Sequence, residues 1–402
     1  MKSKRTPSRK QDLGTRFASS PLMPAAENET ALVKFFLCGD VMLGRGIDQI
    51  LPFSSNPVIH ESFMKSAEDY VEIAEAVSGP IPRQVEFSYI WGDALDSLAR
   101  HSPQARLMNL ETTITSSDRW EDKGINYRMH PGNVPAITAA KIDCCCLANN
   151  HILDWGAQGL IDTITALKRG DVQTAGAGRD AAEARTPAII DLGPQGRVVV
   201  FSLGSLTSGI PPHWAATELR PGIDFLKSLS ERSAASLAKR VSAIRRAGDT
   251  VIVSIHWGGN WGYDIEAEQR EFAHALIDTS GVDLIYGHSS HHPKGIEIYN
   301  GKLVLYGCGD FLNDYEGISG YEEFRGNLTL MYLPTLKHGR LISLNLVPMK
   351  ISRFRLNRAS LHEATWLLEV LNREGRNLGS QFQLTKLAPS PGGALYELQL
   401  VL

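Results

Sequence analysis

Residues 282–311 read VDLIYGHSSHHPKGIEIYNGKLVLYGCGDF. An apolar run ends in Gly287 and His288, two more histidines follow at 291 and 292, and two further β-rich runs come after them. Histidines placed directly after a buried strand are candidate metal ligands or proton carriers. A polar turn is the simpler explanation, and the rest of the chain is needed to choose between the two.

The flanking sequence alternates β-rich and helical patterns. Strands with helical crossovers between them predict an α/β layered core. The expected strands are 31–40, 105–111, 141–150, 197–205, 249–258, 282–289 and 302–310. The expected helices are 156–170, 230–248, 265–281 and 359–375, and a hairpin is expected over 326–351 with its turn near 337–339.

Polar residues fall where several of these apolar runs stop. In open α/β sheets, ligands bind at the carboxyl ends of strands, so residues far apart in sequence are expected to meet at one edge. The set contains carboxylates, an amide and imidazoles without thiolate, which suits Mn²⁺, Fe or Zn²⁺, and it is large enough for two ions. Its members are Asp40, Glu111, Asn150, His151, His256, His288, His291 and His292.

Five blocks in this chain resemble the successive motifs of the poly-γ-glutamate capsule-synthesis (CapA-like) family, a branch of the calcineurin-like metallophosphoesterases. They are FFLCGDVMLGRG, NLETT, ANNHILDWG, SIHWGGNW and YGHSSHHPKGIEIYNGKLVLYGCGDF, within residues 33–315. The resemblance implies a four-layer αββα sandwich that holds two divalent metal ions at its rim. We expect a C-terminal β-hairpin and helix as an extension of that fold.

The resemblance also implies individual roles. Asp40 matches a ligand of the first metal, Glu111 a carboxylate that bridges both ions, and Asn150 an amide ligand of the second. His256 and His288 resemble ligands of the second metal, and His291 a ligand of the first. His151 matches the histidine that protonates a leaving group or steadies an oxyanion. Met42 stands where the superfamily usually has a histidine.

Each of these residues also has a structural explanation. Asp40 and Asn150 are frequent turn or cap residues, and Glu111 is compatible with an ordinary rim carboxylate. His151 and His256 are compatible with hydrogen-bonded core histidines. His292 precedes Pro293, so a plain turn explains it as well as a catalytic role does.

Other residues are candidates for binding or for proton transfer. Arg45 and Arg128 offer a planar fork for a phosphate or carboxylate, and Trp257 and Trp261 are candidate pocket walls. Asp310 follows another strand and is a candidate base. Asp154 either orients His151 or caps the helix that begins near Gly156, and we favour the cap.

Composition limits the partners and the compartment. With 41 basic and 44 acidic residues, the chain has no overall field that would attract nucleic acid or an anionic membrane. Five cysteines, three of them consecutive, do not form a simple disulfide framework, and no apolar segment is long enough for a signal or an anchor. We expect a cytoplasmic protein with a disordered arm over 1–30, a metallophosphoesterase-type domain over 31–350, and a helix and tail over 351–402.

The function expected from these observations is hydrolysis of a peptide, γ-glutamyl or phosphoester substrate at a dinuclear metal site. Metal-assisted epimerisation of a ribosomal peptide is the first alternative, because the same ions would acidify a Cα–H beside a bound carbonyl. A non-catalytic scaffold of polymer biosynthesis is the second.

Overall fold

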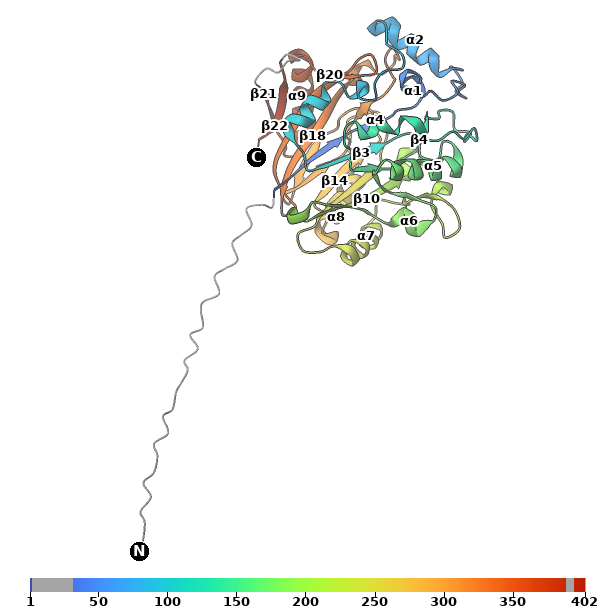
Figure 1. Cartoon of the computed structure of the whole chain (residues 1–402). Coiled ribbons are helices and arrows are strands. Elements are labelled where there is room, and N and C mark those ends of the chain that lie inside the picture. The colour runs from blue at the N-terminus through green and yellow to red at the C-terminus, as the bar shows by residue number, and fades with distance from the viewer. Residues whose placement is uncertain (2–31, 388–393, 402) are drawn as a thin grey trace.

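The computed structural model describes residue 1, residues 32–387 and residues 394–401. The predicted arm over 1–30 therefore lies, apart from Met1, outside the described residues. Two large β-sheets with helices around them make this a mixed α/β protein (Figure 1).

The larger sheet joins segments from both ends of the chain. Its strand order is β17-β2-β3-β1-β18-β19-β22-β21, with β6 beside β3, β7 beside β6, and β20 beside β19. β1 pairs in parallel with β3 and antiparallel with β18, so Leu32 lies opposite Lys337. The bounds are β1 (Leu32–Cys38), β2 (Asp40–Val41), β3 (Ala105–Leu110), β6 (Cys144–Cys146), β7 (Gln173–Ala175), β17 (Asp310–Leu312), β18 (Leu328–Lys337), β19 (Arg340–Ile351), β20 (Leu356–Arg358), β21 (Phe382–Lys386) and β22 (Tyr396–Leu400).

The smaller sheet contains four parallel strands that the sequence predicts, within 197–205, 249–258, 282–289 and 302–310. Its order is β12-β10-β13-β14-β16-β15, with β9 beside β10. His256 and His288 lie opposite each other in the parallel register of β13 and β14, so both imidazoles leave the sheet at one edge. The bounds are β9 (Ala188–Asp191), β10 (Arg197–Ser205), β12 (Phe225–Leu226), β13 (Thr250–His256), β14 (Leu284–His288), β15 (Ile296–Tyr299) and β16 (Lys302–Leu305). Two-stranded pairs are formed by β4 (Thr113–Ile114) with β5 (Arg128–Met129), and by β8 (Ala177–Gly178) with β11 (Gly222–Ile223).

The hydrophobic core divides into three main clusters. One takes buried side chains from strands of both sheets, including Leu37, Leu107, Ile252 and Leu284. A second joins the larger sheet to α1 (Arg45–Ile50), α2 (Ala67–Ser78), α3 (Ala94–His101), α4 (Val134–Thr138) and α5 (Gly156–Arg169). A third joins the smaller sheet to α7 (Glu231–Ile244) and α8 (Ala267–Ser280). The short helix α6 (Ala181–Arg185) lies next to β8 and β11.

Tyr286 links the two sheets, and the three consecutive cysteines are buried on both faces of the larger sheet. The Tyr286 hydroxyl on β14 accepts from the Cys38 backbone N–H at 3.1 Å and donates to the Cys38 carbonyl on β1. Cys145 points into the cluster on the helix side of the larger sheet, whereas Cys144 and Cys146 point between the sheets. The three cysteines are therefore buried on alternating faces, as the strand pattern predicts.

The C-terminal region completes the larger sheet. The predicted hairpin is confirmed, with Lys337 paired to Arg340 across the turn. β22 then pairs with β19, and α9 (Leu361–Gly375) contributes Leu367 and Leu371 to the core between the sheets. Within the described residues, no helix combines the length and apolarity needed to cross a membrane.

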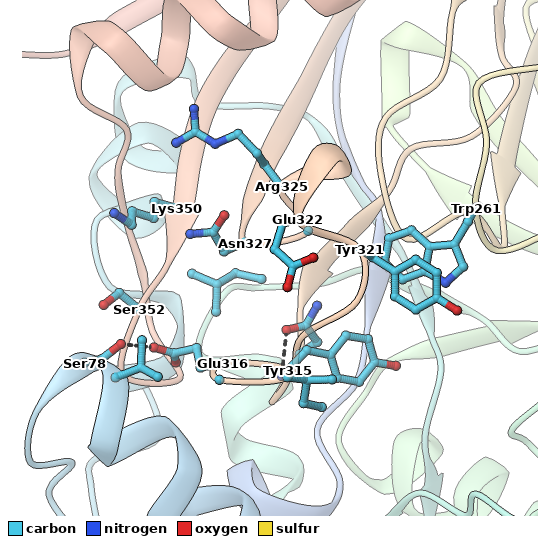
Figure 2. Close-up of a pocket in the computed structure, with 16 residues that line it drawn as sticks. Ser78, Trp261, Tyr315, Glu316, Tyr321, Glu322, Arg325, Asn327, Lys350 and Ser352 are labelled. Atoms are coloured by element: carbon cyan, nitrogen blue, oxygen red, sulfur yellow. Dashed lines mark hydrogen bonds between the residues drawn. The ribbon is translucent and has the colours of Figure 1, made fainter.

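A pocket of about 570 Å³ opens beside β17, between α2, the loop after β17 and β19 (Figure 2). Trp261, Asn313 and Tyr315 line one part of it, and Arg325, Asn327 and Lys350 line another.

Candidate metal centre

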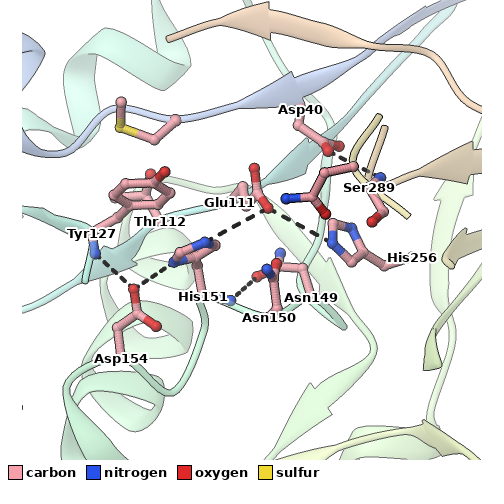
Figure 3. Close-up of polar contacts among 12 residues, drawn as sticks. Asp40, Glu111, Thr112, Tyr127, Asn149, Asn150, His151, Asp154, His256 and Ser289 are labelled. Atoms are coloured by element: carbon pink, nitrogen blue, oxygen red, sulfur yellow. Dashed lines mark hydrogen bonds and ion pairs between the residues drawn. The ribbon is translucent and has the colours of Figure 1, made fainter. Parts of the chain in front are cut away.

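Strand ends bring the predicted ligands to one place. Asp40 lies in β2 and Glu111 directly follows β3, which pairs with β2; His256 ends β13 of the other sheet. Asp40, Glu111 and His256 each present a ligand atom within 4.8 Å of the others. Figure 3 shows Glu111 between two imidazoles, with Oε1 3.7 Å from His256 Nε2 and 4.0 Å from His151 Nε2.

Among the residues that the structure describes, several buried atoms around this triad that could bind a metal ion have no hydrogen-bond partner. They are Asn150 Oδ1 and both ring nitrogens of His256 and of His288. His288 Nδ1 lies only 2.7 Å from Asp40 Oδ1, yet the geometry is not that of a hydrogen bond. Buried polar atoms rarely remain unpaired in proteins, and these are oxygen and imidazole donors of the kind that divalent cations bind. The residues therefore fit a metal centre.

Burial and close neighbours shift the pKa values of all three triad residues. Burial alone would raise the pKa of Asp40, but His288 and His256 lower it to about 2. Burial, together with Asp40 and Asp310, raises the pKa of Glu111 well above its usual value. Burial, reinforced by His288, lowers the pKa of His256 to about 3, so this imidazole is neutral at pH 7 and available as a ligand.

His151 is held with one nitrogen toward the triad. Its Nδ1 lies 2.7 Å from Asp154 Oδ2 and 3.3 Å from Lys123 Nζ, which leaves Nε2 facing Glu111. Burial lowers the pKa of His151 to about 4, with Asp154 opposing that shift and Lys123 adding to it. Our preference for Asp154 as a helix cap is wrong: α5 has Trp155 at its N-cap without a side-chain bond, and Asp154 instead contacts His151 and the Tyr127 N–H.

The other two histidines of the 288–292 segment lie in different surroundings. His291 Nδ1 lies 2.9 Å from Asp310 Oδ1, and β17 places Asp310 opposite Asp40 in β2. Asp310 and Asp40 outweigh burial and raise the pKa of His291. His292 stacks on Phe324 with ring centroids 4.5 Å apart, and its Nδ1 lies 3.3 Å from the Pro293 carbonyl oxygen. His292 thus belongs to an aromatic cluster beside the triad, and its catalytic role stays a prediction.

The predicted substrate-binding residues make internal contacts. Arg45 is buried and binds Glu61, Asp314 and Tyr70. Arg128 donates to the carbonyls of Ser117 and Asn56 and to Asp118, and its guanidinium lies 3.9 Å from the Trp155 ring centroid. Trp257 packs in the core, and its indole N–H donates to the Tyr306 carbonyl. The tryptophan that lines the pocket beside His291 is Trp261.

Four residues of the site were missed in the sequence. Asn109 donates to Asp40 Oδ1 at 2.8 Å, and the Ser289 N–H donates to Asp40 Oδ2 at 3.2 Å. Asn109 is two residues before Glu111, so the period of a strand could have placed both on one face. Lys123 and Tyr127 come from an irregular segment between β4 and β5, where no periodic pattern signals their position.

Comparisons with known proteins show which family the chain resembles. Residues 34–315 match the family model described as bacterial capsule synthesis protein PGA_cap. A probable polyglutamine synthesis accessory protein of Mycobacterium tuberculosis is 48% identical over 352 residues, which cover 87% of this chain and 92% of the relative.

Two Bacillus proteins are more distant relatives. The PGA biosynthesis protein CapA of Bacillus subtilis is 27% identical over 64% of this chain and 61% of its own length. The capsule biosynthesis protein CapA of Bacillus anthracis is 24% identical over 82% of this chain and 70% of its own length. Since the family model spans more than half of the sequence, the chain belongs to the bacterial capsule synthesis (CapA-like) protein family.

Proposed function

We propose that this chain is a metal-dependent enzyme with hydrolase-type chemistry on a peptide, γ-glutamyl or phosphoester bond. The observation that supports this most strongly is the convergence of Asp40, Glu111 and His256 within 4.8 Å at the edge where the two sheets meet. Asn150, His288 and His291 would complete the ligand set for two ions. The division of the core into clusters between and outside the sheets supports a four-layer αββα arrangement.

Divalent ions bound here would supply Lewis-acid activation of water and of a substrate carbonyl or phosphoryl oxygen. The chain itself supplies proton transfer. Asp154 fixes His151 through Nδ1, so that Nε2 is the nitrogen that exchanges a proton with the reacting group. Its neutral form at pH 7 makes it an acceptor first and, once protonated, a donor to a leaving group.

We also propose that the protein works in a reducing compartment such as the cytoplasm. All five cysteines are buried and none forms a disulfide, which supports a protein that works with reduced thiols. The names of the relatives support a place in the synthesis of a glutamate polymer or capsule.

The test is turnover by the purified protein loaded with Mn²⁺, offered a chromogenic phosphoester and a γ-glutamyl anilide in parallel. We expect product from one of them, and its loss in His151→Ala at unchanged metal content. His274→Ala is the control, because His274 pairs with Glu297 on a different part of the smaller sheet. Absence of turnover of either substrate by the wild-type protein would reject hydrolysis of both bond classes.

One observation favours epimerisation as a second candidate. The triad has two separate His–Asp pairs beside it: His151 with Asp154 next to Glu111, and His291 with Asp310 next to Asp40. Two such pairs provide one group to remove a Cα proton and another to return it. Deuterium incorporation at a peptide Cα in heavy water, without cleavage, is the expected signature. A scaffold role would instead be supported if Asp40→Ala combined with His288→Ala preserved cellular function.

A further inference from the structure

Two tyrosines connect the histidine pairs described above. The Tyr127 ring stacks on His151 with centroids 3.9 Å apart, and the Tyr315 ring meets His291 edge-on at 5.5 Å. The two hydroxyl oxygens are 2.6 Å apart, so one phenol donates to the other. A pair of hydroxyls carries two hydrogens and uses one of them in this bond. Among the described residues, neither hydroxyl has another hydrogen-bond acceptor, so the second hydrogen is free to bind a ligand.

A buried ionic network holds this tyrosine pair in place. Arg45 lies with its guanidinium 4.8 Å from the Tyr127 centroid and 5.6 Å from the Tyr315 centroid. Glu61 and Asp314 bind that guanidinium, and Asp314 also accepts from the Gly46 N–H. Arg45 has a φ of 44°, a left-handed conformation that is costly for an arginine and needs such surrounding contacts to persist.

Tyr315 of this pair lines the pocket of about 570 Å³, and its ring also contacts His291 beside the metal centre. Tyr315 lines the pocket together with Trp261, whose ring centroid is 5.2 Å from that of His291. Asn313 also lines the pocket and donates to Asp310, the partner of His291. Figure 2 shows Tyr315 together with the rings of Trp261 and Tyr321, which stack on each other. Tyr315 therefore contacts both the pocket and His291, which is not itself a lining residue.

We propose that the pocket binds the non-reacting part of the substrate, and that the Tyr127–Tyr315 pair donates its free hydroxyl hydrogen to a substrate oxygen at the metal centre. This assignment rests on the proposed function of the same centre. Tyr315 would be a catalytic residue in direct contact with substrate, while Tyr127 and Arg45 would be positioning residues. An oxygen that gains negative charge during the reaction is the expected acceptor, because a fixed donor in a dry site stabilises such charge strongly.

The ionisation state of the phenols agrees with a donor role. Burial raises the pKa of both Tyr127 and Tyr315 well above the usual value, and the nearby Glu111 adds to the shift. Both side chains thus stay protonated at neutral pH.

The experiment compares Tyr315→Phe and Tyr127→Phe with the wild-type protein after each has been loaded with Mn²⁺. Both variants keep the aromatic ring and lose one hydroxyl, so metal content and melting temperature should stay close to those of the wild-type protein. We expect kcat to fall about 10- to 100-fold, with a smaller change in KM, for whichever substrate the wild-type protein turns over. Tyr299→Phe is the matched control: it loses a hydroxyl that bonds Asp278, away from the residues that line the pocket, and its activity should stay within about twofold.

A binding measurement provides a second test that does not depend on turnover. Quenching of tryptophan fluorescence can be followed as inorganic phosphate or γ-glutamylglutamate is added, because Trp261 lines the pocket. If the wild-type protein is active and Tyr315→Phe is equally active, the tyrosine assignment is overturned and the proposed function stands. If the wild-type protein is inactive but binds a probe, and Tyr315→Phe weakens that binding at least fivefold, the pocket assignment stands and hydrolysis fails. If the wild-type protein neither turns over a substrate nor binds a probe, both fail.

Discussion

His256 is the residue of the candidate metal centre whose burial most needs an explanation. Among the described residues its two ring nitrogens have no hydrogen-bond partner, and it shares the triad with Asp40 and Glu111. Its presence at the end of a core strand is therefore better explained by ligand binding than by packing.

The first prediction concerns metal content. His256→Ala removes one of the three ligands that lie within 4.8 Å of each other, so bound Mn²⁺ measured by elemental analysis should fall to half of the wild-type amount or less. His274→Ala should retain the wild-type amount. Equal metal content in the two variants would show that His256 is not a ligand.

The second prediction concerns the pH dependence of the metal-free protein. The pKa of His256 falls from 6.5 to about 3 on folding, and the pKa values of His151 and His292 fall to about 4. Each imidazole binds a proton in the unfolded chain but stays neutral in the folded one. Its contribution to stability is thus complete above pH 6.5 and is lost as the pH falls toward the folded value.

Glu111 and His291 have the opposite effect, because a pKa raised on folding favours the folded state as the pH falls. We expect the three histidines with lowered pKa values to outweigh these two groups, so chelator-treated protein should unfold at a lower temperature at pH 5 than at pH 7.5. A melting temperature that rises from pH 7.5 to pH 5 would contradict this. Added Mn²⁺ should raise the melting temperature at pH 7.5, since it binds the folded state.

The third prediction tests the orientation of His151. Asp154→Asn keeps the shape of the side chain but weakens its hold on Nδ1, so kcat should fall about 10- to 100-fold while metal content is retained. Asp162→Asn is the control, because Asp162 bonds Thr115 and Gln158 on the outer side of α5. An Asp154→Asn variant with wild-type kcat would leave Asp154 a purely structural role.

At the residue scale, the sequence predicted which side chains meet at the candidate metal centre better than it predicted the residues that support them. Asp40, Glu111 and His256 terminate apolar runs, and that position is visible in a one-dimensional pattern. Lys123 and Tyr127 reach the site from a loop, so their contacts depend on how the loop folds back. Asp154 was misassigned because a residue before a helix resembles a cap, whatever its side chain actually contacts.

At the level of elements, the geometry of the centre depends on the close approach of β2 and β17. Gly39 precedes β2, and a Cβ added there would lie 1.9 Å from the Gly309 carbonyl oxygen. This contact is between backbones, so a side chain cannot be accommodated by rotation. Glycine is required at this position because the two strands bring Asp40 and Asp310 into register.

The fourth prediction follows from that contact. Gly39→Ala should separate β2 from β17, which lowers the affinity for Mn²⁺ and the free energy of unfolding, the latter by about 1–3 kcal/mol. Isothermal titration and urea denaturation measure the two effects. Gly259→Ala is a suitable control, because a Cβ there would meet its nearest neighbour at an ordinary 3.9 Å. Equal effects in the two variants would contradict the argument.

Several of the longer elements could be predicted, while their pairing could not. The strands 197–205 and 249–258 and the helices 156–170, 230–248 and 265–281 occur within a few residues of their expected bounds. Short strands such as β2, β4 and β17 were not expected, because two or three residues carry no periodicity. The hairpin of β18 and β19 was expected as an extension, and its pairing with β1 is a long-range contact that local patterns do not encode.

At the scale of the whole molecule, the metal centre requires both sheets to stay in contact, since Asp40 and His256 come from different sheets. Tyr286 fastens them together through two hydrogen bonds to the backbone of Cys38. Its ring also meets that of His288 edge-on at 4.1 Å.

The fifth prediction uses this link. Tyr286→Phe keeps the ring but leaves the buried Cys38 N–H and carbonyl without the hydroxyl, which should lower the free energy of unfolding by about 1–3 kcal/mol. Tyr299→Phe, which loses a bond to Asp278 near the surface, should cost less than about 0.5 kcal/mol. Guanidinium denaturation of both variants compares the two costs, and similar values would show that the link between the sheets is energetically unimportant.

The position of β1 between β3 and β18 has a consequence for biosynthesis. As the chain leaves the ribosome, β1 emerges early, whereas its antiparallel partner over 328–337 emerges only after most of the protein has been translated. During that interval one edge of an apolar strand lacks its neighbour and is open to wrong pairing with other nascent chains. Premature termination before residue 328 should therefore yield aggregated fragments that require chaperones, even though such fragments would contain every proposed metal ligand.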